Sequence, residues 1–306
     1  MRIYVTGVSG FVGGFLAEQL RQAGHTVLGC GSSDASRLAA PDGLARFDAL
    51  RLGTAAPDGT FAELDVVIHA AYAPGKAQEA VNVDGTVAWA RQAARESAPH
   101  QIFLSSHSAD AAASSAYGRQ KYALERFFLD HGHIVLRLGL VIGDGGLFRR
   151  MADLMRRLPV LPMLDGGRAP TPVTSPADLA QIVARLLDTA APPGNAADLA
   201  HNLFNAEPVS LRALLLELRR ALGRRTLFLP IPSAILVPPL VLARRLGVPL
   251  PVDEENLRGY RANRGRLRAS DYGRLRHEPT PFTTMVDAAA AAYLSRLNGS
   301  PTGKSS

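Results

Sequence analysis

The chain opens with a short strand that runs directly into a glycine-rich turn and a helix, and this feature constrains its fold most. Gly7, Gly10 and Gly13 follow the apolar run Ile3–Thr6 at intervals of three residues. Glycines at such a turn let the chain reverse tightly and bring backbone N–H groups against a pyrophosphate, which the helix dipole also attracts. The spacing is G-x-x-G-x-x-G, whereas ordinary dinucleotide dehydrogenases carry G-x-G-x-x-G. The turn predicts a dinucleotide-binding α/β fold.

The first half of the sequence alternates strands with helices. We expect buried strands over Ile3–Thr6, Thr26–Gly29, Val66–Ala70, Ile102–Ser105 and Ile134–Leu138, and helices over Phe11–Ala23, Ala77–Arg95 and Ala116–His131. Strands that alternate with amphipathic helices form right-handed crossovers and a parallel sheet. Beyond about Asp144 prolines break this rhythm, and later helices are expected near Ala177–Leu187 and Leu211–Leu222.

These patterns give an α/β fold class with a Rossmann-type, doubly wound parallel sheet and a smaller, irregular C-terminal substrate-binding part. We expect the dinucleotide-binding domain over residues 1–143, with later segments able to return to the sheet. The substrate-binding region then covers 144–297, and residues 298–306 form a disordered tail.

Composition excludes several classes of protein. Lys and Arg number 34 against 27 Asp and Glu, but the positive charge is mostly arginine and is spread along 306 residues, so we expect no nucleic-acid partner. With a single cysteine and no cluster of metal-ligand spacing, neither a disulfide framework nor a metal is expected. Prolines interrupt the apolar stretch 227–251, so we expect no membrane insertion. No signal peptide is visible, which makes a cytoplasmic location the default.

Tyr117 and Lys121 form the clearest catalytic pattern. Their spacing of four residues at the start of a helix places both side chains on one face. An ammonium beside a phenol stabilises the phenolate and lowers the phenol pKa from about 10 towards neutrality. Such a tyrosine can donate or accept a proton. Lysines are so few in this chain that the pair rarely arises by chance, and we interpret it as catalytic.

The residues after the second strand bear on which dinucleotide is bound. An acidic residue there binds the ribose hydroxyls, whereas small or basic residues accept a 2′-phosphate. No acid occupies the strand tip, and Ser32, Ser33 and Arg37 could hold the phosphate. Asp34 would oppose it if its side chain pointed inward. We therefore expect NADP(H) to be slightly favoured over NAD(H).

Several motifs together resemble one family. They are Thr6-Gly7-x-x-Gly10-x-x-Gly13, Asp48-Ala49, Asp65-Val-Val-Ile-His69-Ala70-Ala71, Asn82-Val-Asp-Gly85-Thr86, Tyr117-x-x-x-Lys121 and Arg137-Leu-Gly-Leu-Val-Ile-Gly143. Weaker patterns follow at Ser175-Pro-Ala-Asp178 and Asn202-Leu-Phe-Asn205. Over about residues 1–295 the chain resembles the short-chain dehydrogenase/reductase superfamily, in its extended branch, the NAD-dependent epimerase/dehydratase family.

The resemblance implies roles for individual residues. Tyr117 would be the acid/base, and Lys121 would hold the nicotinamide ribose while tuning the tyrosine. Asp48 would contact adenine. The implied cofactor-binding set is Gly7, Ser9, Gly10, Phe11, Val12, Gly13, Ser32, Ser33, Arg37, Asp48, Ala49, Ala70, Ala71, Tyr72, Asn82, Ser105, Tyr117, Lys121 and Leu138. The helices around 77–97 and 116–131 would pair across a homodimer.

The segment after the fourth predicted strand departs from the family pattern. A serine or threonine there would orient the substrate oxygen, but the matching position falls on His107. Either Ser106 or Ser108 supplies the hydroxyl, or the histidine donates the hydrogen bond itself, unless it is only a solvated loop residue. We favour Ser106 as the third catalytic residue.

A second departure bears on the substrate. Relatives that act on nucleotide-sugars commonly carry Asn where this chain has Leu140, and the stretch Leu227–Pro251 is also apolar. That stretch resembles steroid- and flavonol-type reductase relatives, although it could equally be core or a dimer contact. We expect an NAD(P)-dependent oxidoreductase acting on a carbonyl/alcohol pair of a small, partly apolar metabolite. The substrate would bind beside loops Leu140–Arg150, Arg168–Val173 and Asn256–Leu267.

Two alternatives remain open. The first is a nucleotide-sugar epimerase or dehydratase, which the family match favours and Leu140 disfavours. The second is a non-catalytic protein that senses NAD(P) on the same fold. Such sensors often lose the tyrosine or the lysine, whereas Tyr117 and Lys121 are both present here.

Overall fold

The computed structural model describes residues 1–31, 43–75, 78–96, 98, 100–188, 198–207, 209–232 and 268–299. The chain divides into two compact units. The first consists of Met1–Leu138, Pro176–Phe204 and Arg268–His277, and the second of Gly139–Ser175, Asn205–Leu267 and Glu278–Ser306. Every predicted catalytic residue belongs to the first unit.

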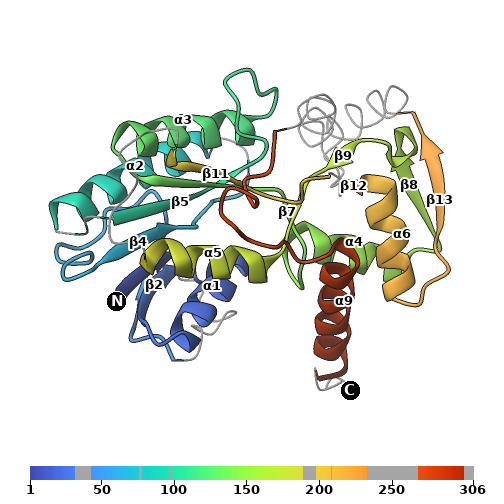
Figure 1. The fold of residues 1–306 in the computed structure, drawn as a ribbon, viewed down its shortest axis with the longest axis horizontal. Coiled ribbons are helices and arrows are strands. Elements are labelled where there is room, and N and C mark those ends of the chain that lie inside the picture. Colours follow the sequence, from blue (N-terminus) through green and yellow to red (C-terminus); the bar gives the residue numbers. More distant parts are fainter. Residues whose placement is uncertain are drawn as a thin grey trace, which may run out of the picture. The chain divides into compact units, whose positions relative to one another are not determined.

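The first unit is built on a parallel sheet of seven strands (Figure 1). Their order across the sheet is β11-β6-β5-β4-β1-β2-β3, so the strand order reverses between β1 and β4. The strands are β1 (Arg2–Thr6), β2 (Thr26–Gly31), β3 (Arg46–Ala49), β4 (Val66–His69), β5 (His100–Ser106), β6 (Ile134–Leu138) and β11 (Ala200–Leu203). The predicted doubly wound Rossmann-type sheet is confirmed.

Helices cover both faces of this sheet. On one face α2 packs on α3, and on the other α1 packs on α5 (Figure 1). Their bounds are α1 (Phe11–Gln22), α2 (Glu79–Arg95), α3 (Ala116–Asp130) and α5 (Pro176–Asp188). The fully buried ring of Trp89 belongs to one apolar cluster of this unit, and the stacked rings of Phe103 and Phe128 belong to another. At about 25 cal/mol per Å² of buried apolar surface, such rings contribute most to holding the layers together.

The sequence patterns did not predict β3 or β11, and both are edge strands of the sheet. An edge strand has a neighbour on only one side, so it needs fewer apolar residues than a central strand. The side chains of Arg46, Phe47 and Asp48 in β3 are accordingly half-buried, and β11 carries His201 and Asn202. The periodicity of apolar residues alone therefore does not predict β3 or β11.

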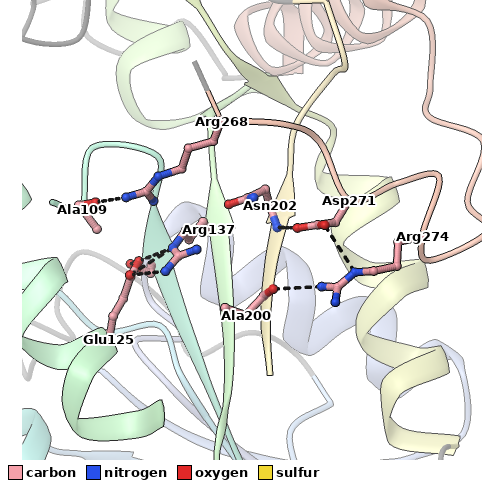
Figure 2. A network of polar contacts seen from close by, with 9 residues as sticks. Ala109, Glu125, Arg137, Ala200, Asn202, Arg268, Asp271 and Arg274 are labelled. Carbon is pink, nitrogen blue, oxygen red and sulfur yellow. Dashed lines mark hydrogen bonds and ion pairs between the residues drawn. The ribbon is translucent and has the colours of Figure 1, made fainter. Parts of the chain in front are cut away.

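A separate segment near the C-terminus joins the first unit beside β11. Asp271 accepts from the backbone N–H of Asn202 at 2.7 Å, and its own N–H donates to the carbonyl of Asn202 at 3.0 Å. Arg274 donates to the carbonyl of Ala200 at 3.0 Å (Figure 2). The segment Arg268–His277 is thus tied to the sheet edge by backbone and charged contacts.

The second unit has its own apolar core. Phe148, Leu214 and Val286 are fully buried there, and α6 packs on α9. Its elements are β7 (Leu140–Val141), α4 (Gly146–Arg157), β8 (Val160–Leu164), a 3₁₀ turn (Asp165–Gly167), β9 (Pro170–Thr171), β10 (Val173–Thr174), β12 (Val209–Ser210), α6 (Leu211–Ala221), β13 (Leu227–Ile231) and α9 (Phe282–Gly299). The helix α9 includes Asn298 and Gly299, at which the predicted tail begins.

Candidate functional site

The glycine-rich turn is closed as tightly as its sequence suggests. Gly7 has a φ of 75°, and its N–H donates to the carbonyl of Cys30 at 2.7 Å. A Cβ on Gly7 would lie 2.8 Å from Cα of Ala71, and one on Gly13 would lie 2.4 Å from the oxygen of Gly7. Real side chains do not fit at these distances, so the turn depends on glycine at both positions.

The N-terminus of α1 has features that suit an anion. Gly10 caps the helix without a side chain, and the first turn carries no acidic residue. The first N–H groups of a helix have no intrahelical partner, and the helix dipole places partial positive charge there. Phe11, Val12 and Gly13 contribute these first-turn positions. The turn and the helix start therefore fit the pyrophosphate of a dinucleotide.

The turn lies where β1 and β4 adjoin, at the reversal of strand order. The hydroxyl of Thr6, at the end of β1, accepts from the N–H groups of Ala70 and Ala71 at 3.1 Å each. Asn82 of α2 is buried, and its amide bonds both the N–H and the carbonyl of Ala73, at 2.8 and 3.0 Å. The predicted cofactor residues at this edge are thus brought together, with Asn82 fixing the loop after β4. Ligands of open α/β sheets bind at such reversals.

The ends of β2 and β3 form the next part of the crevice. Asp48 pairs with Cys30 across the strands, and its carboxylate accepts from the Tyr4 hydroxyl at 2.8 Å and from Arg46 Nε at 3.0 Å. Burial raises the pKa of Tyr4 above its usual range, with further contributions from Cys30 and Asp48. Ala49 pairs with Gly31. Ser32, Ser33 and Arg37, predicted to hold a 2′-phosphate, lie outside the described residues.

Sequence reasoning did not identify Gly29 or Gly31 as important to this crevice. A Cβ on Gly31 would lie 2.6 Å from Oγ of Ser9, and one on Gly29 would lie 2.5 Å from Val8. Both glycines let the turn approach β2 closely. Glycine inside a strand is a recognised sign of close backbone approach, so the signal was present in the sequence.

The helix α3 carries the predicted tyrosine and lysine. It begins after Ser115, whose hydroxyl accepts from the N–H of Gly118 at 3.1 Å and caps the helix. Lys121 is buried, and its Nζ donates to the carbonyl of Leu104 at 2.8 Å. The same Nζ lies 6.0 Å from the ring centre of Tyr117. Burial lowers the pKa of Lys121 to about 8, and the charge of Glu125 opposes that shift.

Tyr117 differs from the sequence prediction in its acidity. Burial raises the pKa of its phenol, and a hydrogen bond with the Ser106 side chain only partly opposes this. The Tyr72 ring packs edge-on against it, with centroids 5.1 Å apart. The lowered pKa that the spacing predicted for Tyr117 is therefore not found in this structure, because burial is the larger effect on the phenol.

Of the three residues considered for orienting the substrate oxygen, Ser106 is the one that meets Tyr117. Ser106 ends β5, and its hydroxyl also accepts from the N–H of Ser108 at 3.2 Å. His107 is buried, its N–H donates to the carbonyl of Leu138 at 2.7 Å, and its ring packs edge-on against Phe204. His107 is therefore not a solvated loop residue, and the catalytic role of Ser106 stays a prediction.

A buried ion pair that the sequence reasoning missed lies behind the pair on α3. Glu125 is 1% exposed and accepts from Ser105 Oγ at 2.6 Å. Arg137 of β6 donates to it from Nε at 2.9 Å and from Nη2 at 2.8 Å (Figure 2). Glu125 follows Lys121 by four residues and so shares its face of α3, where Leu124 and Phe128 are also buried; a charged residue at this spacing was a readable signal.

The described residues contain neither a metal-binding cluster nor a membrane-spanning helix. No group of three or more His, Cys, Asp or Glu side chains in that part of the chain could hold a metal ion. Among the same residues, no helix is long and apolar enough to cross a membrane. Within the described residues, the candidate site consists of hydroxyl, ammonium and backbone groups.

Comparisons with known proteins agree with this geometry. The model of the NAD dependent epimerase/dehydratase family matches residues 3–197. No curated protein sequence matches the chain significantly. Among solved structures, UDP-glucose 4-epimerase from Thermotoga maritima has a TM-score of 0.73 at 15% identity, covering 97% of this chain and 100% of that one.

Two further solved structures have the same fold. The dTDP-glucose 4,6-dehydratase of Bacillus anthracis, in complex with NAD, has a TM-score of 0.71 at 13% identity and covers 98% of both chains. A short-chain dehydrogenase/reductase protein of Agrobacterium tumefaciens with bound NAD has a TM-score of 0.67 at 18% identity, covering 97% of this chain and 98% of that one. The chain belongs to the NAD dependent epimerase/dehydratase family, in the extended branch of the short-chain dehydrogenase/reductase superfamily.

Proposed function

We propose that this protein is an NAD(P)-dependent epimerase or dehydratase of a nucleotide-linked sugar. Its reaction would begin with oxidation of a hydroxyl-bearing carbon of the sugar. One observation carries the proposal: Tyr117 is hydrogen-bonded to Ser106 at the end of β5 and has Lys121 Nζ 6.0 Å from its ring centre, in a unit whose glycine turn suits a dinucleotide. A proton-transferring phenol beside a hydride-accepting cofactor is what such an oxidation requires.

The residues divide the chemistry between them. A bound NAD(P)⁺ supplies the nicotinamide carbon that accepts the hydride. Tyr117 Oη takes the proton of the substrate hydroxyl, and the Ser106 hydroxyl, which is hydrogen-bonded to Tyr117, orients the same oxygen. Lys121, whose Nζ donates to the Leu104 carbonyl and lies 6.0 Å from the ring centre of Tyr117, would hold the ribose of the bound nucleotide.

The proposed substrate class differs from the partly apolar metabolite that the sequence favoured. Leu140 was the main reason for that choice, but its side chain packs against the apolar core of the second unit. It thus has a structural role that does not require an apolar ligand. The family match and the solved epimerase and dehydratase of nucleotide-sugars support the sugar instead.

A reductase of a partly apolar carbonyl compound remains the second candidate. The observation that favours it is the exposure of two apolar side chains on β13, Leu227 at 65% and Leu229 at 55%. The rest of the apolar stretch, residues 233–251, and the loop Asn256–Leu267 lie outside the described residues. The substrate-binding role of residues 144–297 stays a prediction.

The nucleotide content of the purified protein separates these candidates. We expect that denaturing the protein and assaying the supernatant will release close to one equivalent of nucleotide, because an epimerase or dehydratase reduces and reoxidises the same cofactor within one cycle. A protein that is purified empty and binds NADPH reversibly would instead indicate the reductase. Failure to bind either nucleotide would contradict the dinucleotide site. The same assay decides between NAD(H) and the NADP(H) that Ser32, Ser33 and Arg37 favour.

We also propose a homodimer formed through α2 and α3. These helices carry half-buried apolar side chains, Val83, Val87, Phe127 and Leu129, at the edge of the core beneath them. Burying such side chains between two copies is favourable. Light scattering coupled to size-exclusion chromatography should give twice the mass of the 32.6 kDa chain. A mass of one chain across micromolar concentrations would contradict the proposal.

A further inference from the structure

The carboxylate of Glu125 has hydrogen-bond partners from two strands. It accepts from Ser105 Oγ on β5 and from Nε and Nη2 of Arg137 on β6, at 2.6 to 3.0 Å (Figure 2). Glu125 itself lies on α3, one helical turn after Lys121. This one side chain therefore ties the helix that carries Tyr117 and Lys121 to the two strands beneath it.

Lys121 lies on the same face of α3 but has no direct anionic partner. Its Nζ donates to the Leu104 carbonyl and lies 4.7 Å from the ring centre of Phe103 and 5.6 Å from that of Tyr72. No carboxylate of the described residues lies within ion-pair distance of it. A buried ammonium in such surroundings loses its hydration and needs a nearby counter-charge to remain protonated.

Groups from α3, β5 and the loop after β4 surround Lys121. Tyr117 and Glu125 face it from α3, and Tyr72 faces it from the loop after β4. The adjoining residues of β5 contribute only the Phe103 ring and the Leu104 carbonyl, and β6 contributes Arg137 through Glu125. Glu125 is thus the only carboxylate in this described cluster, against two cations. Its removal would leave the buried Lys121 and the half-buried Arg137 without an anion in this cluster.

We propose that Glu125 is a positioning residue for the Tyr117–Lys121 pair, providing the counter-charge of Lys121 and holding α3 on β5 so that Nζ reaches the Leu104 carbonyl. Only its effect on turnover rests on the proposed function; the charge and the geometry do not. Burial lowers the pKa of Lys121 to about 8, and the charge of Glu125 raises it. The sign of the Glu125 effect is the one expected of a counter-charge.

The test is a direct titration of the lysine. The chain contains three lysines, Lys76, Lys121 and Lys304, so protein labelled with ¹³C at lysine Cε gives three resonances that single Arg replacements assign. In Glu125→Gln, we expect the midpoint of Lys121 to fall by about one pH unit, because an opposite charge nearby shifts a pKa by roughly that amount or more. An unchanged or higher midpoint overturns the proposal.

Two further variants separate charge from packing. Asp130→Asn removes a carboxylate from the same helix, but Asp130 is exposed and pairs with Arg126, so the Lys121 midpoint should not move. Arg137→Gln should raise the titration midpoint of Lys121, because the negative charge of Glu125 is then no longer balanced by the positive charge of Arg137. Loosened packing would admit water and raise the midpoint in both Glu125→Gln and Arg137→Gln, so opposite signs are specific to the proposed role.

If Glu125→Gln does not fold, the titration of Lys121 in Arg137→Gln tests the proposal instead. A raised midpoint with the amide-exchange protection of α3 intact supports the proposal, and an unchanged midpoint or lost protection overturns it. Where turnover is measurable, the alkaline limb of kcat/KM should move down in Glu125→Gln with the lysine midpoint. A midpoint that falls as expected in a protein that binds no dinucleotide would refute the proposed function and leave the role of Glu125 standing.

Discussion

Tyr117→Phe is expected to lower kcat by about 10²- to 10⁴-fold, the usual contribution of a positioned acid or base. The substitution removes the hydroxyl that meets Ser106 and keeps the ring, which packs edge-on against Tyr72. Nucleotide affinity should therefore remain within a few-fold of the wild type. Single-turnover kinetics and calorimetric titration with NAD(H) and NADP(H) measure the two effects separately.

Tyr122→Phe is the matched control for this variant. Tyr122 lies on the same helix, and the same hydroxyl is removed at a position outside the site, so turnover should be unchanged. Equal turnover of Tyr117→Phe and the wild type would contradict the role of the tyrosine. If the protein were instead a sensor of NAD(P), binding of its partner should not respond to Tyr117→Phe, and this outcome would favour the non-catalytic alternative.

Gly13→Ala should weaken nucleotide binding by at least about tenfold, equivalent to about 1.4 kcal/mol. On an exposed helix the change from Gly to Ala stabilises by about 1 kcal/mol. Here the new Cβ would lie 2.4 Å from the oxygen and 2.9 Å from the carbonyl carbon of Gly7, both of them backbone atoms. Overpacking of this kind costs about 1–3 kcal/mol, so Gly13→Ala should destabilise the protein instead of stabilising it. The turn should open to make room for the new Cβ.

Thermal unfolding with and without nucleotide measures both consequences. Gly13→Ala should unfold at a lower temperature than the wild type and should gain less stability from added nucleotide. Gly273→Ala serves as the control, because a Cβ at Gly273 meets nothing within 4 Å and its φ is not in the left-handed region. A Gly13→Ala protein with wild-type stability and affinity would show that the close approach of α1 to Gly7 is not required.

The strands at the centre of the sheet could be predicted because burial on both faces leaves an unmistakable apolar run. The expected strand Ile134–Leu138 is found with the same bounds, and the helices α1, α2 and α3 begin and end within two residues of the expected bounds.

The structure also gives a physical reason for the two weaker family patterns, at 175–178 and 202–205. The side-chain amide of Asn202 donates to the carbonyl of Ala269 at 3.0 Å, and Asp178 lies 3.2 Å from Nε2 of His277, so both side chains hold the segment 268–277.

The sequence by itself determined the α/β fold, the glycine turn and the pairing of Tyr117 with Lys121, because strand periodicity, glycine spacing and helical spacing are all local properties. Tertiary structure alone decided that Ser106 meets Tyr117 and that Lys121 donates to Leu104. It also placed Glu125 opposite Arg137, a contact between a helix and a strand. These outcomes depend on how far each group is buried and on which strand lies beneath it, and no local pattern carries that information.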